Sequence, residues 1–135
     1  PPPPPSVQAE DGIRDSVNGL VGSEMCIRDR FKRAVATFDS IARETVDDLE
    51  GHLDDIDWFI PHQANMRIIK AAARKIGLPM ERVIATVDEH ANTSGASIPL
   101  ALDLAVKDGR VKRGDTLLMA AFGAGFTWGS AMIRF

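Results

Sequence analysis

Two polar motifs in the sequence carry side chains that can bind or polarise a ligand. Pro61-His62-Gln63-Ala64-Asn65 holds an imidazole, which can donate a hydrogen bond from a ring nitrogen. His90-Ala91-Asn92-Thr93-Ser94 offers the carboxamide of Asn92 as a donor among small residues. Both motifs also have a structural explanation, because His62 can cap a following helix, and Asn, Thr and Ser are common in turns and N-caps.

A third motif, residues 121–129 with the sequence AFGAGFTWG, is rich in glycine. Glycines let a backbone approach a ligand closely and turn its N–H groups toward an oxyanion. The spacing is not GxGxxG before a helix, so it does not indicate a dinucleotide site. Taken alone, this motif is typical of a plain glycine-rich hairpin turn.

The hydrophobic pattern predicts the elements that must position these motifs. Helical periodicity predicts helices over 31–50, 64–76 and 96–107, and apolar runs predict strands over 56–60, 83–87, 116–122 and 128–135. This alternation is typical of an α/β layered domain with a mostly parallel sheet, closed here by one antiparallel hairpin. The strands are apolar enough to be buried on both faces of the sheet, and three helices are too few to cover both faces. The sequence therefore indicates a second half-domain or another subunit.

Each of the three motifs follows the C-terminal end of a different predicted strand. Binding sites in open α/β sheets gather at the carboxyl ends of the strands. If these strands run in the same direction, one site at the edge of the sheet is lined by His62, Asn92 and the glycine-rich motif. This convergence carries more weight than any of the motifs alone.

A group of basic residues lies on the predicted helix beside His62. No acidic residue occurs between Asp57 and Glu81, whereas this segment holds four cations, three of them spaced three and four apart along one helix face. A solvated helix face explains such a run, and docking of an acidic partner or a phosphate-bearing ligand is the functional alternative. The four residues are Arg67, Lys70, Arg74 and Lys75.

Composition excludes several classes of protein. The 135 residues have a formal net charge of −3, which does not suit a basic nucleic-acid binder. Cys26 is the only cysteine, so neither an internal disulfide framework nor a zinc site built on several cysteines can form. There is no apolar run near the roughly 20 residues that span a bilayer, and the beginning does not resemble a secretory signal. We therefore expect a cytoplasmic location.

Residues 1–30 differ from the rest of the sequence in composition and periodicity. They open on five prolines, repeat the triplet Ile-Arg-Asp and show neither helical nor strand periodicity. We interpret them as a non-native leader, such as translated adapter sequence, or as a disordered tail, and exclude them from the fold. The predicted domain is residues 31–135.

The segments DWFIPHQANMRII, DEHANTSGASIPLALD and AAFGAGFTWGSAMIRF, in this order, resemble the C-terminal half of β-ketoacyl-acyl-carrier-protein synthase III. The resemblance covers about residues 31–135. It implies a thiolase-like fold, of which this chain would be the C-terminal half of an αβαβα layered sandwich. In this family an acyl group from acyl-CoA is first loaded on a cysteine. A carbanion formed from malonyl-acyl-carrier protein then attacks this acyl thioester.

The resemblance also implies roles for individual residues. His62 and Asn92 correspond to the histidine and asparagine that stabilise the enolate formed by decarboxylation. The oxyanion loop corresponds to Phe122, Gly123, Ala124 and Gly125, where Ala124 departs from the three glycines common in the family. Asn65, with Asn92, matches contacts of the coenzyme A or pantetheine arm. The segment linked to carrier-protein binding corresponds to Gln63, Ala64, Asn65, Met66 and Arg67, supported by Lys70, Arg74 and Lys75.

The family implies acyl carrier protein and acyl-CoA as partners, a homodimer in the intact enzyme, and no cofactor or metal. The nucleophilic cysteine belongs to the first half, and Cys26 in EMCIRDR does not resemble its setting. We therefore expect that this polypeptide alone cannot form the acyl-enzyme. The alternatives are a related condensing enzyme with another acyl substrate and a non-catalytic module that binds carrier protein or coenzyme A. A metal site on the three histidines fits no compact ligand motif.

Overall fold

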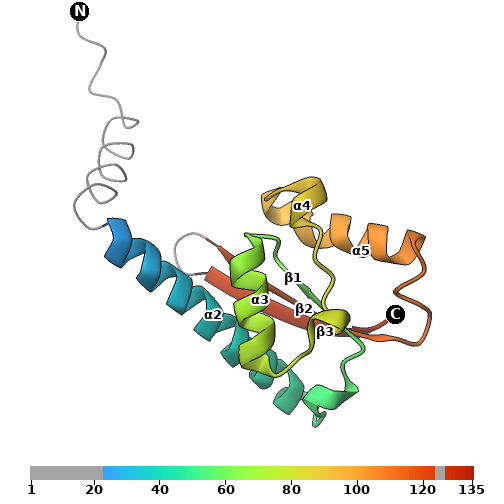
Figure 1. The fold of residues 1–135 in the computed structure, drawn as a ribbon. Coiled ribbons are helices and arrows are strands. Elements are labelled where there is room, and N and C mark those ends of the chain that lie inside the picture. The colour runs from blue at the N-terminus through green and yellow to red at the C-terminus, as the bar shows by residue number, and fades with distance from the viewer. Residues whose placement is uncertain (1–22, 124–126) are drawn as a thin grey trace, which may run out of the picture. The chain divides into compact units, whose positions relative to one another are not determined.

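The computed structural model describes residues 23–123 and 127–135, with side chains from residue 28 onward. Residues 1–33 and 34–135 form two compact units, and the second holds the sheet and all three motifs. The strands are β1 (Trp58–Pro61), β2 (Thr116–Gly123) and β3 (Thr127–Arg134). The helices are α2 (Ser23–Asp48), α3 (Met66–Ile76), α4 (Val87–His90) and α5 (Ser97–Lys107), and 3₁₀ turns lie at Leu53–Asp55, Met80–Arg82 and Ser94–Ala96 (Figure 1).

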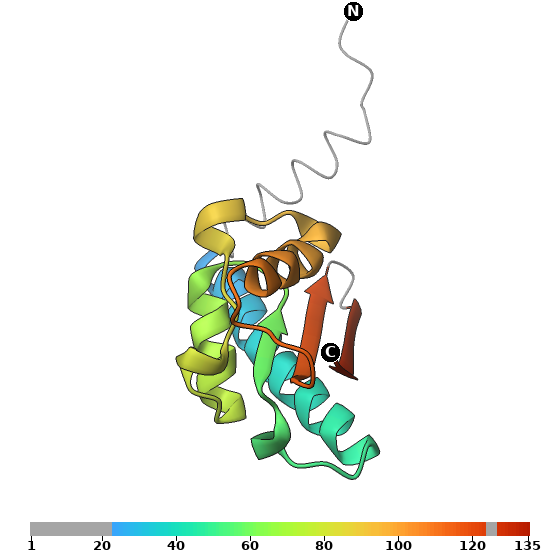
Figure 2. The ribbon, with the colours of Figure 1, turned by 90° about the vertical axis from the view of Figure 1, so that its right-hand side faces the viewer.

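The sheet is mixed and has the order β1-β2-β3. β1 runs parallel to β2, with Ile60 opposite Met119, and β2 pairs with β3 as an antiparallel hairpin, with Leu118 opposite Met132. Figure 2 shows the arrows of β1 and β2 pointing the same way and that of β3 the opposite way. The predicted antiparallel hairpin at the end of the chain is therefore confirmed.

Helices cover both faces of the sheet, because two separate apolar clusters line it. On one face the buried side chains of α2 and α3 pack against Phe59 and Leu118, and the rings of Phe38 and Phe59 meet edge to face with centroids 6.4 Å apart. On the other face α5 packs against Ile60 and Leu117. Apolar residues of β1 and β2 thus point to both faces, which explains why these strands have continuous apolar sequences.

The predicted strand over 83–87 is wrong. Val83 alone forms a bridge with Phe59, and the Ile84 N–H donates to the Phe59 carbonyl over 2.9 Å. The N–H of Thr86 then donates to the side chain of Gln63, and the chain turns into α4 at Val87. A side-chain acceptor therefore replaces the next rung of the ladder, which the local sequence pattern cannot reveal.

Helix α2 begins at Ser23, eight residues before the predicted start at residue 31, so residues 23–30 are helical. The boundary between a leader and the domain at residue 30 stays a prediction. The expectation that all strands are buried on both sides is wrong for β3, whose residues are exposed apart from the half-buried Met132. This strand lies at the sheet edge, where only one neighbour covers it.

Candidate active site

His62 directly follows β1 and continues its ladder, because its N–H donates to the Ala120 carbonyl over 2.7 Å. The half-buried ring lies against the start of α5, where Nδ1 is 2.7 Å from the Ser97 hydroxyl oxygen. That hydroxyl oxygen also accepts the Gln63 N–H over 3.2 Å. The imidazole is therefore held by a backbone rung on one side and by a buried hydroxyl on the other.

Burial lowers the pKa of His62 below its ordinary value, because desolvation disfavours the charged imidazolium. A hydrogen bond between the ring and the backbone of Ser94 has the opposite, smaller effect and raises the pKa. The net effect is a lowered pKa, which favours the neutral imidazole. A neutral imidazole is the form that can donate a single N–H to an oxygen on which negative charge develops.

Asn92 lies in the loop that touches the His62 ring through Ser94. The Asn92 side chain is exposed, and its Oδ1 accepts the N–H of Ser94 over 3.0 Å. No described residue is hydrogen-bonded to its Nδ2, so the amide N–H groups are the part that can serve a ligand. Two non-glycine residues with positive φ flank it, Ala91 at 55° and Ser94 at 52°. The structure thus places the Asn92 loop just before the start of α5, against which the His62 ring lies, and the convergence of both side chains on one ligand stays a prediction.

Gln63 is fully buried and ties the His62 motif to the segment that leads into α4. Its Nε2 donates to the carbonyls of Pro61 and Ile84 over 2.8 and 3.1 Å, and its Oε1 accepts the Thr86 N–H over 2.7 Å. A side chain with three buried partners cannot reach a carrier protein, so the assignment of Gln63 to the carrier surface is corrected. A glutamine between a strand and a helix can be a buried side chain that hydrogen-bonds the backbone of neighbouring segments. The sequence alone does not show which backbone groups need such a partner.

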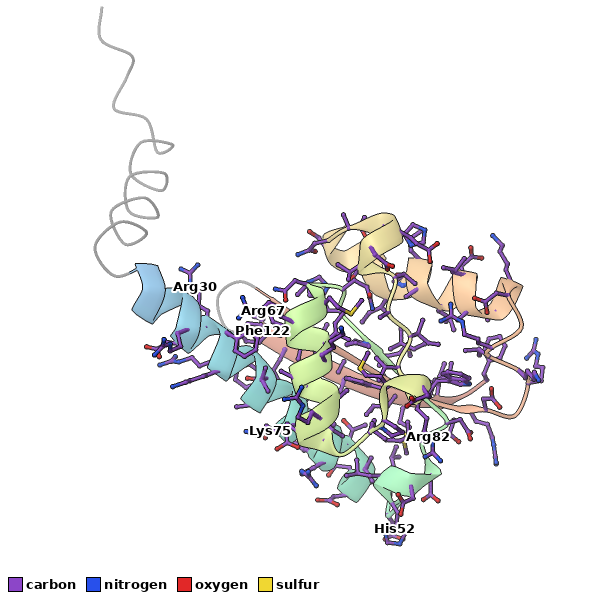
Figure 3. All side chains as sticks on the ribbon, in the orientation of Figure 1. Arg30, His52, Arg67, Lys75, Arg82 and Phe122 are labelled. Atoms are coloured by element: carbon purple, nitrogen blue, oxygen red, sulfur yellow. The ribbon has the colours of Figure 1, made fainter. Side chains whose placement is uncertain are left out.

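Helix α3 presents the predicted basic residues to solvent. Arg67, Lys70, Arg74 and Lys75 are all exposed, and Figure 3 shows Arg67 and Lys75 toward opposite ends of α3. Asn65 caps this helix, because its Oδ1 accepts the Ile68 N–H over 2.9 Å. Ala64 and Met66 are half-buried, and the apolar residues of α3 face the core. The helix therefore separates an apolar inner face from a cationic outer face.

The glycine-rich motif forms the turn of the β2–β3 hairpin. Phe122 pairs with Trp128 and Gly123 with Thr127, whereas Ala124 and Gly125 lie outside the described residues. Because β1 and β2 are parallel and Pro61 lies opposite Ala120, the chain leaves both strands at the same edge of the sheet. His62 and the end of β2 therefore share an edge, which agrees with the predicted convergence.

The described residues also bear on metal binding and membrane insertion. Among them, no group of three histidine, cysteine, aspartate or glutamate side chains is arranged to hold a metal ion. No helix in the described ranges is both long and apolar enough to cross a bilayer. The structure does not describe the side chain of Cys26.

Residues 47–135 match a family model described as 3-Oxoacyl-[acyl-carrier-protein (ACP)] synthase III C terminal. The β-ketoacyl-[acyl-carrier-protein] synthase III of Sphingopyxis alaskensis is 55% identical over 120 residues, which cover 88% of this chain and 37% of that protein. The relative of the same name from Thioalkalivibrio sulfidiphilus is 61% identical over 112 residues, covering 83% and 35%. The chain thus spans little more than a third of the length of these curated relatives.

Solved structures give the same result. The β-ketoacyl-[acyl carrier protein] synthase III of Thermus thermophilus has a TM-score of 0.77 and 47% identity, covering 80% of this chain and 34% of that one. The 3-oxoacyl-[acyl-carrier-protein] synthase III of Aquifex aeolicus has a TM-score of 0.78 and 44% identity, covering 80% and 35%. The fold is therefore thiolase-like α/β, and the chain belongs to the 3-oxoacyl-[acyl-carrier-protein] synthase III family, whose C-terminal part it carries.

Proposed function

We propose that this chain is the C-terminal part of an acyltransferase that condenses acyl-CoA with malonyl-acyl-carrier protein at the start of fatty-acid synthesis. His62 and Asn92 would act as hydrogen-bond donors. The observation that carries the proposal is the contact between their segments, in which the His62 Nδ1 is 2.7 Å from the hydroxyl oxygen of Ser97, five residues beyond Asn92. Asn92 supports it further, because its oxygen is already bound and its amide N–H groups are left for a ligand.

The chemistry follows from where charge develops. In decarboxylation the bond from the malonyl methylene carbon to its carboxylate breaks, carbon dioxide leaves, and the electron pair moves into the thioester. Negative charge then gathers on the thioester oxygen, and two neutral N–H donors aimed at that oxygen stabilise the enolate more than the ground state. The carbanion attacks the acyl thioester on a cysteine, whose thiolate leaves. That cysteine would come from outside residues 47–135, since no cysteine occurs there.

A fusion protein tests this proposal. Residues 47–135 would be joined to the region of the S. alaskensis relative that this chain does not cover, and release of carbon dioxide from malonyl-acyl-carrier protein would be measured. Removing one oxyanion donor typically lowers kcat about 10²–10³-fold, so His62→Ala and Asn92→Ala should each cause a loss of this size. His52→Ala removes an exposed histidine and serves as the control. Unchanged decarboxylation in both variants would refute the assigned roles.

The cationic outer face of α3 favours a carrier-docking role for this helix. Charged surfaces steer acidic partners and weaken with salt. Lys70→Glu and Arg67→Glu should raise the Kd for acyl carrier protein, with a larger effect at low than at high salt. Lys112→Glu, an exposed cation outside α3, should leave the Kd unchanged. Equal effects of all three variants would argue against a specific docking face.

Two alternatives share parts of this evidence. A non-catalytic module that binds carrier protein or coenzyme A would need only the basic face of α3, and the fusion protein would then keep its function after His62→Ala. A related condensing enzyme would keep both donors but prefer another acyl-CoA, which turnover with a series of acyl-CoA chain lengths would reveal. Homodimerisation and the absence of a cofactor are further proposals, open to sedimentation and elemental analysis of the same protein.

A further inference from the structure

Ser97 begins α5, at a position where a serine is usually interpreted as a helix cap. Its side chain does not cap the helix; it is 99% buried from solvent (1% exposed) and its oxygen faces the end of β1. Two groups lie within hydrogen-bond distance, the His62 Nδ1 at 2.7 Å and the Gln63 N–H at 3.2 Å. One ring nitrogen and one backbone N–H, from two consecutive residues, are thus brought to a single hydroxyl.

The protons at this hydroxyl can be counted. A serine oxygen has one hydrogen to donate and two lone pairs to accept with. The Gln63 N–H can only donate, so it occupies a lone pair. If the His62 Nδ1 also carried a hydrogen, the serine would accept twice and its own hydrogen would have no acceptor among the described residues. Leaving a buried donor without an acceptor is unfavourable, so the favoured arrangement has Ser97 donating to a bare Nδ1.

We propose that Ser97 is a positioning residue that holds His62 as the neutral tautomer with its hydrogen on Nε2. This inference rests on the proposed function, in which His62 donates to the enolate oxygen. With Nδ1 occupied by the serine hydroxyl, the one hydrogen of the neutral ring lies on Nε2, from which it can be donated to the enolate oxygen in place of the Ser94 backbone. Protonating Nδ1 would turn the serine hydrogen away from its partner, so the same contact opposes formation of the imidazolium.

The inference explains why the site combines residues that lie far apart in the sequence. Gln63 places its own N–H on Ser97 and its side chain on Thr86, which leads into the loop of Asn92. Ser97 therefore receives one hydrogen bond from the segment that carries His62 and directs its hydrogen back to the ring. The tautomer is set by folding, before any substrate is present.

Nitrogen NMR of the 135-residue chain tests the inference without measuring activity. The ring signals of His62 would be assigned by their loss in His62→Gln and compared with those of the exposed His52 in the same sample. In the unaltered protein at pH 7.5 we expect a hydrogen-bonded, unprotonated Nδ1 and a protonated Nε2. Ser97→Ala should shift the Nδ1 signal toward that of a nitrogen without a donor and raise the pKa of His62. Ser97→Thr, which keeps the hydroxyl, should restore both.

A protonated Nδ1 in the unaltered protein would overturn the inference. This outcome does not depend on whether any variant folds. An Nδ1 signal and a pKa that stay unchanged in Ser97→Ala would also overturn it. The result is independent of the proposed function, because the decarboxylation assay with His62→Ala decides whether His62 acts at all. The NMR experiment decides which nitrogen carries the hydrogen.

Discussion

His62 combines a site that excludes charge with contacts that orient its ring. Half-burial disfavours the imidazolium, while Ser97 and the Ser94 backbone fix the ring relative to the Asn92 loop. Asn92 needs no such tuning, because a carboxamide does not titrate and keeps its donors at any pH. The two side chains therefore differ in one respect that an experiment can use: only the histidine changes its charge with pH.

The stability of the chain should depend on pH through His62. Its pKa in the folded chain is below the ordinary 6.5, so below that value the unfolded chain binds more protons than the folded one. The stabilising effect of a neutral His62 is complete above 6.5 and is lost as the pH falls through the lowered folded pKa. We expect the free energy of unfolding in urea to fall between pH 7.5 and pH 5 by more in the parent than in His62→Gln. Equal slopes in both proteins would contradict this prediction.

At the level of elements, α3 both carries the proposed docking face and fixes the end of the His62 motif. Asn65 caps this helix with its side-chain oxygen, and Gly77 ends it in the left-handed conformation, with φ of 94°. The sequence predicted both ends of this helix closely, because cap residues and apolar periodicity are local signals. The cap also accounts for Asn65 without any ligand, so its assignment to the pantetheine arm stays a prediction.

Two substitutions at Asn65 separate capping from ligand contact. Asn65→Ala removes the acceptor for the Ile68 N–H and should lower the free energy of unfolding by about 1 kcal/mol, whereas Asn65→Asp keeps an acceptor and should cost less. Urea unfolding of the chain measures both. In the fusion protein, a higher KM for acyl-CoA in Asn65→Asp, at near-parental stability, would show a separate contact of the amide. A parental KM would leave Asn65 as a cap only.

What the sequence could not predict depends on distant partners. The strand expected over 83–87 has suitable β-branched residues, yet only Val83 pairs, because the Gln63 side chain takes the Thr86 N–H. The burial of Gln63 and the contact of Ser97 with His62 follow from the same cause, since each joins segments more than 20 residues apart. The directions of the strands were predictable. A long connection that contains helices joins β1 to β2 and favours a parallel pair, whereas a hairpin joins β2 to β3 and makes that pair antiparallel.

At the level of the whole molecule, one side of the hairpin is left uncovered by the residues that the structure describes. Trp128 is 57% exposed and Leu49 is 55% exposed, and both line a groove of about 410 Å³ together with Ile41 of α2 and Ser130 of β3. Large apolar side chains exposed together on a surface mark contacts with other protein segments. The length of the relatives offers such a segment, because this chain covers 37% of the S. alaskensis protein.

We therefore expect Trp128 to become protected when the uncovered region of the relative is joined to this chain. Trp58→Phe would be introduced in both proteins, and any tryptophan of the joined region would be replaced by phenylalanine, so that Trp128 alone reports; quenching of its fluorescence by acrylamide would then be measured. Strong quenching in the chain and weak quenching in the fusion protein is the expected result. Equal quenching in both would show that this side of the hairpin stays open in the longer protein.

The backbone around Asn92 has a consequence for the proposed binding of a thioester. Ala91 combines φ of 55° with ψ of −163°, a region that residues other than glycine rarely adopt, and Ser94 is also left-handed. The surrounding structure stabilises this backbone geometry on folding, before any ligand binds. Under the proposed function, a loop whose backbone is ordered in advance would lose little entropy when substrate binds.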